Sequence, residues 1–185
     1  MNPSAPSDHA PPGQTLPSHT PRWYWEDFPV GNERDFGGMA VTRDAVIAFA
    51  SQFDPQPFHL DDAAGAASLF GGLSASGWHT CAMAMRMMCD AYLLDSASLG
   101  SPGIDSLRWL QPVRPGDVLR LRMQVLQARP MASKPHVGLV QSRWEMRNQR
   151  EEAVLTMEGW GMFRRRPEAT QTTQTAQTTQ PTGNH

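Results

Sequence analysis

An aspartate and a histidine lie five residues apart in a segment where the chain must bend. Asp54 and His59 enclose two prolines in the run Asp54-Pro55-Gln56-Pro57-Phe58-His59. Because proline restricts its own backbone and that of the residue before it, this run is predicted to lack regular helix. A bend can turn both side chains toward one point, where a carboxylate and an imidazole can hold one water molecule and exchange protons with it. The spacing fits equally a surface turn in which Asp54 caps local amides and His59 is solvated.

A second candidate lies at the predicted start of a long helix, in the run Ser76-Gly77-Trp78-His79-Thr80. Amides at a helix N-terminus lack a partner inside the helix and attract negative charge. Gly77 has no side chain, so a substrate can approach its backbone closely. The segment is therefore a candidate oxyanion hole. Ser76 could instead be a plain helix cap, and His79 could line the same pocket or point away from it.

Other chemistries find less support in the sequence. Asp61 and Asp62 follow His59, but no second histidine lies at metal-ligand spacing, so we predict no metal site. The residues around Ser76 lack the G-x-S-x-G pattern of a serine nucleophile. The sequence also lacks the glycine patterns that bind dinucleotides or nucleoside triphosphates, and we predict no cofactor.

Hydropathy patterning predicts the elements that must position these residues. The first half of the chain predicts a strand over residues 36–41 and helices over residues 43–53, 61–67 and 77 to about 94. In the long helix the apolar positions recur at helical spacing; they are Trp78, Cys81, Ala82, Met85, Cys89, Tyr92 and Leu93. A helix this apolar is expected to be wrapped by a sheet.

The second half of the chain is strand-like. Partial alternation of apolar and polar residues predicts strands over residues 104–110, 118–128, 137–148 and 153–164. Turn residues separate them at Pro115-Gly116 and over residues 148–152. A mostly buried helix followed by consecutive antiparallel strands predicts the α+β class, with a curved sheet around the helix.

Composition excludes several classes of protein. The 185 residues carry 16 Lys and Arg against 18 Asp and Glu, and binding to nucleic acid by charge needs a basic excess. No stretch approaches the roughly 20 apolar residues of a membrane span, and the first residues carry no signal-peptide pattern. We therefore expect a cytoplasmic protein that binds neither nucleic acid nor membrane. Cys81 and Cys89 would lie about 12 Å apart on the helix, beyond disulfide reach.

The two ends of the chain differ from the rest in composition. Residues 1–21 are rich in Pro, Ser and small residues, and the other end is almost entirely Thr, Gln and Ala. Such tracts cannot bury enough surface to offset the entropy of ordering. We expect residues 1–21 and 167–185 to be disordered and residues 22–166 to form one domain.

With these residues placed, the sequence resembles the MaoC-like acyl dehydratase family. This family is a branch of the hot-dog superfamily that includes the (R)-specific enoyl-CoA hydratases. Its motif D-x-N-P-x-H is matched by the run from Asp54 to His59, with Gln56 in place of the asparagine. Residues 70–80 resemble the lead into the family's central helix, and residues 107–117 resemble its strand–turn segment.

The resemblance implies a homodimer of hot-dog folds that holds an acyl-CoA thioester near the dimer interface. Asp54 and His59 would activate the water that adds to C3 of a trans-2-enoyl thioester, and one of them would return a proton to C2. The Gly77 amide would stabilise the enolate-like thioester oxygen. The reaction would need no metal or redox cofactor, because the thioester already acidifies the α-carbon.

Four residues are further candidates for substrate binding: Ser76, Trp78, Arg108 and Trp109. Trp78 and Trp109 could bound a short acyl pocket or flank a longer tunnel, and Arg108 is a candidate phosphate contact. Ser76 stands where the family often has a histidine before the helix glycine. The acyl chain, and the choice between CoA and acyl carrier protein, stay open.

The sequence thus predicts an enzyme, a hydro-lyase of the enoyl-CoA hydratase or 3-hydroxyacyl-CoA dehydratase type, with two alternatives. A hot-dog thioesterase usually places an acidic residue on or beside the central helix, and the acid within this helix is Asp90, far from Gly77. A non-catalytic acyl-CoA-binding domain would not need an intact Asp54 and His59.

Overall fold

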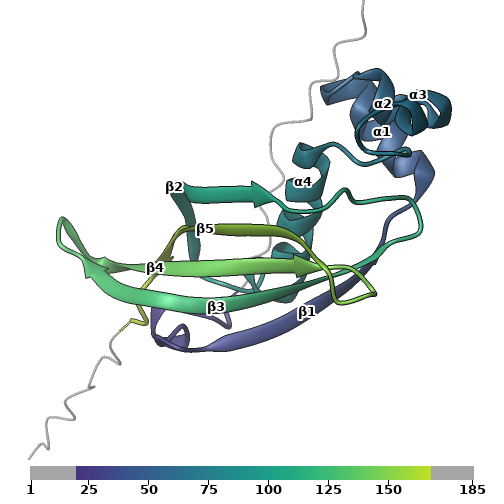
Figure 1. Ribbon diagram of the computed structural model, residues 1–185. Coiled ribbons are helices and arrows are strands. Elements are labelled where there is room, and N and C mark those ends of the chain that lie inside the picture. The colour runs from purple at the N-terminus through teal and green to yellow at the C-terminus, as the bar shows by residue number, and fades with distance from the viewer. Residues whose placement is uncertain (1–19, 168–185) are drawn as a thin grey trace, which may run out of the picture.

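Five antiparallel strands form one curved sheet around a long helix (Figure 1). The computed structural model describes residues 20–167. The strand order is β1-β3-β4-β5-β2, and the strands are β1 (Glu33–Ala40), β2 (Ser98–Trp109), β3 (Val118–Met131), β4 (Lys134–Arg147) and β5 (Ala153–Arg164). The helix that the sheet encloses is α4 (Gly77–Met88). This arrangement confirms the predicted α+β class. The disorder predicted for residues 1–21 and 167–185 falls almost entirely outside the described residues.

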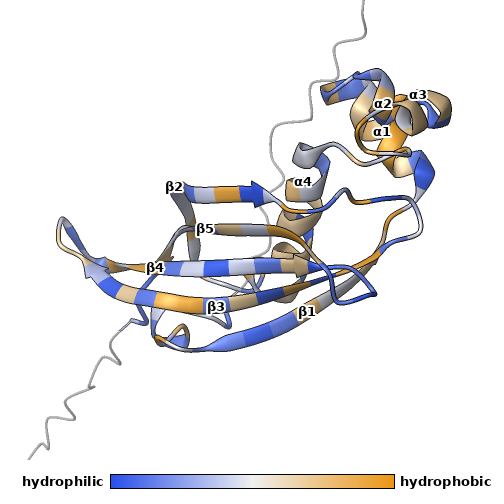
Figure 2. Cartoon of the chain, viewed as in Figure 1, coloured by the Kyte–Doolittle hydropathy of each residue, from blue (hydrophilic) through white to orange (hydrophobic). Residues whose placement is uncertain are grey.

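Strand β3 shows why the sheet encloses the helix on one face. Exposed and buried residues alternate along its first half, and hydropathy alternates with them (Figure 2). The buried side chains are Leu119, Leu121, Met123 and Val125. They belong to the same hydrophobic core cluster as the buried methionines of α4. Burial of apolar surface between the two elements holds the helix in the curve of the sheet.

Three short helices gather at one end of the molecule, beside the start of α4 (Figure 1). They are α1 (Arg43–Phe53), α2 (Pro57–Leu60) and α3 (Asp62–Ala67). Thr42 caps α1 and Asp61 caps α3, because their side chains accept the amides of Ala45 and Ala64. The prediction that the Pro-rich run lacks helix is wrong for α2. Pro57 is the first residue of that helix, where a missing N–H costs nothing.

Helix α4 departs from its prediction in two ways. The helical run continues past Met88 as a π-helical turn, η2 (Cys89–Leu93), before the chain enters β2. The predicted apolar positions are also only partly buried, since the exposed fractions of Trp78 and Met85 are 61% and 51%. Met83, Ala84, Met87 and Met88 are buried instead. Alanine and methionine make up half of the helix and lie on both its buried and its exposed sides, so periodicity alone does not decide which face meets the sheet.

Strand β2 is longer than predicted and is one of the two edge strands of the sheet. It begins at Ser98, and its pairing with β5 shifts register around Gly100 and Gly103. All its residues except Leu107 are exposed. No helix among the described residues is long and apolar enough to cross a membrane. Cys81 and Cys89 are both free thiols.

His79 packs α4 against α1. Its ring stacks on Phe49 with a centroid distance of 4.7 Å and an interplanar angle of 5°. The side chain is buried, and its Nδ1 atom has no hydrogen-bond partner within residues 20–167. Burial lowers the pKa of His79, because the charged imidazolium is poorly solvated there.

We expect acid to weaken this packing. The pKa of His79 is lower in the folded chain than in the unfolded one, so the unfolded chain binds the proton first and stability falls as pH drops. His79→Phe should keep the ring stack and lose this part of the pH dependence. Melting temperatures from about pH 7.5 to about pH 5, where histidines titrate, should fall less for the variant than for the wild type. Parallel curves would contradict this role for His79.

Candidate active site

A cavity of about 540 Å³ lies where the short helices meet the end of β2. It opens between the C-terminus of α1, helix α2 and the N-terminus of α4. Its lining includes Asp54, His59, Gly77, Trp78 and Trp109. The structure therefore brings both predicted catalytic residues, the predicted oxyanion-hole glycine and both predicted tryptophans to the wall of one cavity.

Asp54 is the residue that directly follows α1, and two side-chain donors fix its carboxylate. Ser76 Oγ donates to Oδ2 at 2.6 Å, and Gln56 Nε2 donates to Oδ1 at 2.7 Å. These hydrogen bonds, the one from Ser76 first, lower the pKa of Asp54 against the opposing effect of desolvation. Asp54 is therefore held as a carboxylate facing the cavity.

His59 lies on α2 with its ring almost fully buried. Its Nδ1 atom lies 2.7 Å from the backbone oxygen of Ser74. A carbonyl oxygen can only accept, so Nδ1 carries the hydrogen, and in the neutral ring Nε2 keeps a lone pair. The rings of Phe58 and Phe70 pack against the imidazole at centroid distances of 4.6 Å and 5.9 Å. The tautomer and the ring orientation are thus both fixed by neighbouring groups.

The two reactive atoms face each other across a short gap. His59 Nε2 and Asp54 Oδ2 lie 3.6 Å apart, longer than an ordinary hydrogen bond of about 2.7–3.2 Å. One oxygen atom on the cavity side of this gap can reach both of them at hydrogen-bond distance. The arrangement can therefore hold a water molecule or a substrate hydroxyl between a carboxylate and the imidazole nitrogen Nε2.

Gly77 presents its backbone to the same cavity. It is the first residue of α4, so its N–H is among the amides that a helix leaves without an internal partner. Ser76 Oγ accepts the N–H of Trp78, the following residue. Trp109 Nε1 donates to the Gly77 oxygen at 2.9 Å, and its ring lies so close that a Cβ at Gly77 would be 2.6 Å away. The close tryptophan ring thus leaves no room for a side chain at this position.

Two predicted substrate contacts do not line this cavity. Ser76 is fully buried and reaches the cavity only through the carboxylate of Asp54. Arg108 is exposed on β2, in register with Thr156 of β5, and lies outside the cavity lining. Ser76 thus orients the carboxylate of Asp54, whereas Arg108 is not among the residues that line the cavity.

Sequence reasoning missed two contacts that orient the pair. Gln56 reaches the Asp54 carboxylate with its side-chain amide. A carboxamide two residues from a carboxylate in a bend was the available signal. The backbone oxygen of Ser74 orients His59. No sequence signal identifies it, because every residue carries a backbone carbonyl.

The acidic residues that follow His59 have structural partners. Asp61 caps α3, and Asp62 forms an ion pair with Arg43 at 2.5 Å. Within residues 20–167 no three His, Cys, Asp or Glu side chains are grouped to hold a metal ion.

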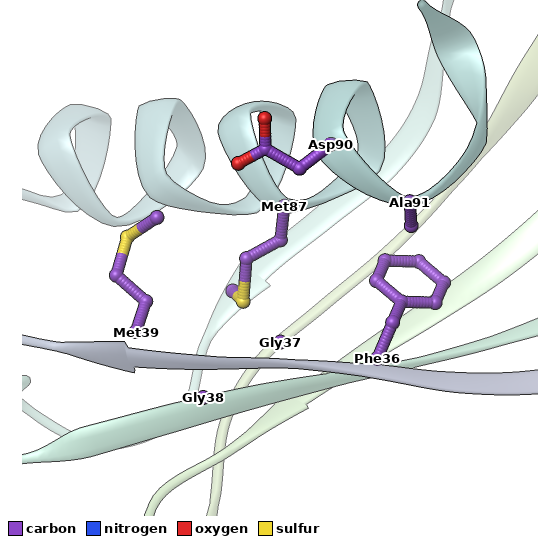
Figure 3. A pocket seen from close by; sticks show the side chains of 7 residues that line it. All are labelled: Phe36, Gly37, Gly38, Met39, Met87, Asp90 and Ala91. Carbon is purple, nitrogen blue, oxygen red and sulfur yellow. The ribbon is translucent and has the colours of Figure 1, made fainter. Parts of the chain in front are cut away.

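A different hollow, of about 390 Å³, lies between β1 and α4 (Figure 3). Phe36 and Met39 of β1 point toward the helix there, and Met87 of α4 points toward the strand. Asp90 is the titratable residue in its lining, and its carboxylate points away from β1. Asp90 forms an ion pair with Arg86 at 2.9 Å. The acid that a thioesterase would need thus lines a separate hollow from Asp54 and His59.

Comparison with known proteins shows the family of the chain. The model of a family described as MaoC like domain matches residues 27–144, which is more than half of the chain. A solved MaoC-like dehydratase from Rhodospirillum rubrum is 41% identical, with a TM-score of 0.73, and the match covers 78% of this chain and 99% of that one.

Two further similarities are more distant. The uncharacterized protein YdeM of Bacillus subtilis is 25% identical over 130 residues, which are 70% of this chain and 91% of that protein. The R-hydratase PhaJ1 from Pseudomonas aeruginosa is 22% identical with a TM-score of 0.63, covers 77% of this chain and 86% of that one, and shows the fold alone. By the family match and the Rhodospirillum structure, the chain belongs to the MaoC-like dehydratase family, with a hot-dog fold.

Proposed function

We propose that the protein is a hydro-lyase that adds water reversibly to a trans-2-enoyl-CoA, or removes it from a 3-hydroxyacyl-CoA. The observation that carries the proposal is the 3.6 Å separation of His59 Nε2 and Asp54 Oδ2 on the wall of a cavity. Both atoms can contact one water molecule there. The Gly77 amide on the same wall is a donor for the thioester oxygen.

The hydrogen bonds suggest different roles for the two residues. Ser76 and Gln56 lower the pKa of Asp54, which makes it a weak base and a stable anion. His59 Nε2 is then the better acceptor for the proton of the bound water. The Asp54 carboxylate stabilises the imidazolium that forms, and the Ser74 oxygen keeps the Nδ1 hydrogen in place.

The proposed reaction balances within this set of groups. The water oxygen bonds to C3 while one of its protons passes to His59 Nε2. Negative charge moves to the thioester oxygen, where the Gly77 amide donates a hydrogen bond. The proton then returns from Nε2 to C2, which restores the neutral ring and completes the addition of one water. Dehydration follows the same steps in reverse.

Removing either member of the pair should strongly lower turnover without unfolding the chain. Asp54→Asn and His59→Ala should each lower kcat with crotonyl-CoA by about 10²–10⁴-fold, the usual contribution of acid–base catalysis. The readout is loss of the ultraviolet absorbance of the enoyl thioester, with melting temperature measured alongside. Asp62→Asn removes an acid from the exposed Arg43 pair and is the matched control.

The outcomes separate the alternatives. Full activity in Asp54→Asn would contradict the proposal. Release of free CoA thiol by the wild type would indicate a thioesterase. Saturable binding of crotonyl-CoA with no chemical change to any enoyl-CoA would indicate a binding domain.

The effect of the Ser76 hydrogen bond should be measurable in the titration of the Asp54 carboxyl group. It is the largest cause that lowers the pKa of Asp54, so Ser76→Ala should raise that pKa. In a carbon NMR titration the signal of the Asp54 carboxyl group should then change at higher pH than in the wild type, because the carboxylate is protonated earlier on acidification. Ser76→Thr keeps a hydroxyl and is the control. Loss of the helix cap should also cost about 1 kcal/mol of stability; an unchanged titration of the Asp54 carboxyl group would contradict the role of Ser76.

We also propose that two copies of the chain pair through β2. This strand is an edge of the sheet, and all its residues except Leu107 are exposed. Large apolar side chains on it, Leu99 and Ile104, are among those exposed. Long edge strands with exposed apolar groups are normally covered in native proteins. A second copy of β2 would cover this edge by continuing the sheet.

Light scattering tests this pairing. The mass in solution should be twice the 20.5 kDa of one chain. Ile104→Asp should shift it toward one chain, because a charge would then lie in the pairing surface. Val30→Asp changes an exposed apolar residue outside β2 and should leave the mass unchanged. A single-chain mass for the wild type would refute the proposal.

A further inference from the structure

A second cavity, of about 320 Å³, lies between α4 and the inner face of the sheet. Its lining comes from α4, η2 and strands β2 to β5, together with Phe28. Most of the lining side chains are apolar, among them Met85, Met88, Leu107, Val140 and Met157. None of the lining residues, all within the described part of the chain, is charged. The cavity therefore suits an apolar chain, and its lining within the described residues includes no carboxylate and no imidazole.

Trp78 lies where this apolar cavity adjoins the candidate active site. It lines both cavities, and within the described residues the two linings have no other member in common. The two cavities thus adjoin at the indole of Trp78, which we call the partition.

Neighbouring groups hold the partition in place. The Trp78 ring packs edge-on against Trp109, with a centroid distance of 5.5 Å and an interplanar angle of 81°. Trp109 is in turn anchored by its hydrogen bond to the Gly77 oxygen. Gly77 is the residue whose amide we assign to the thioester oxygen, and Trp78 directly follows it. An acyl chain that leaves the thioester thus meets the two indoles within a few carbons.

We propose that Trp78 is the specificity-determining residue of the reaction. Its indole closes the acyl end of the active-site cavity and restricts the enzyme to short 2-enoyl chains. The apolar cavity receives a longer chain only when that indole is removed. This inference rests on the proposed hydratase function.

The test compares chain-length profiles. Values of kcat/KM are measured with crotonyl-CoA, trans-2-hexenoyl-CoA and trans-2-octenoyl-CoA for the wild type, Trp78→Ala, Trp78→Leu and Met85→Ala. The wild type should prefer crotonyl-CoA and lose activity as the chain lengthens. Trp78→Ala should reverse the order, with a gain of up to about fourfold for each added methylene that becomes buried. Trp78→Leu should shift the profile in the same direction by less.

Met85→Ala is the matched control. Met85 lines the apolar cavity and not the active-site cavity. Its truncation enlarges the space behind the partition but leaves the partition in place, so the order of the wild type should persist. Melting temperature and mass in solution are measured for every variant.

Each contrary result has a distinct meaning. A wild type that prefers octenoyl-CoA, or tryptophan variants that keep its order, would overturn the inference while leaving the hydratase function intact. A changed mass with an unchanged order would assign Trp78 to subunit contact instead and would also overturn it. Failure of the wild type to hydrate any of the three thioesters would overturn the proposed function, and this inference with it.

Discussion

The hydrogen bond from Ser76 to Asp54 joins the two segments on which the site depends. Asp54 ends α1, and Ser76 caps α4 twenty-two residues later. One hydroxyl accepts the Trp78 amide and donates to the carboxylate, so the start of the long helix and the position of the acid are fixed together. The same contact keeps the acid ionised. Reactivity and packing therefore depend on one side chain.

Hydrogen bonds between loops and helix ends hold the site more directly than the sheet does. The Gln56 amide fixes one oxygen of Asp54, and the Ser74 carbonyl fixes the histidine ring. The Trp109 indole reaches the Gly77 carbonyl from the end of β2. The curved sheet contributes mainly by placing α4, whose N-terminus then meets the loops from α1 to α3 (Figure 1). The sheet thus acts as a scaffold, and the loops and helix ends carry the candidate catalytic groups, as in many folds.

Much of the fold was predictable because local pattern and tertiary structure agree. Helix α1 and strand β5 begin and end as predicted, since a threonine cap and clear alternation define them. The prediction for α2 failed because Pro57 occupies the one helical position that tolerates proline. The face of α4 was not predictable, because its residues are apolar on most sides and only the sheet selects Met83 and Met87 for burial.

The candidate site was predictable in its residue types and less so in their geometry. Asp54, His59 and Gly77 are marked by proline, spacing and helix start. The role of Ser76 was not predictable. A serine before a helix predicts a cap, but it does not predict a hydrogen bond to a carboxylate twenty-two residues away. The position of Trp78 between two cavities depends on Trp109, thirty-one residues later, and no local pattern reports such a contact.

The π-helical turn that follows α4 has a consequence for comparing sequences. In η2 the amide of Leu94 bonds to the oxygen of Cys89, five residues back, so one extra residue is accommodated in the turn. The end of the helical run is therefore turned about 100° around the axis from its place in an uninterrupted α-helix. Tyr92, within the turn, packs against Phe28 and Phe36. A gapless alignment with a homologue that lacks the turn would pair the last residues of the run, Leu93 and Leu94, with residues on a different side of the helix.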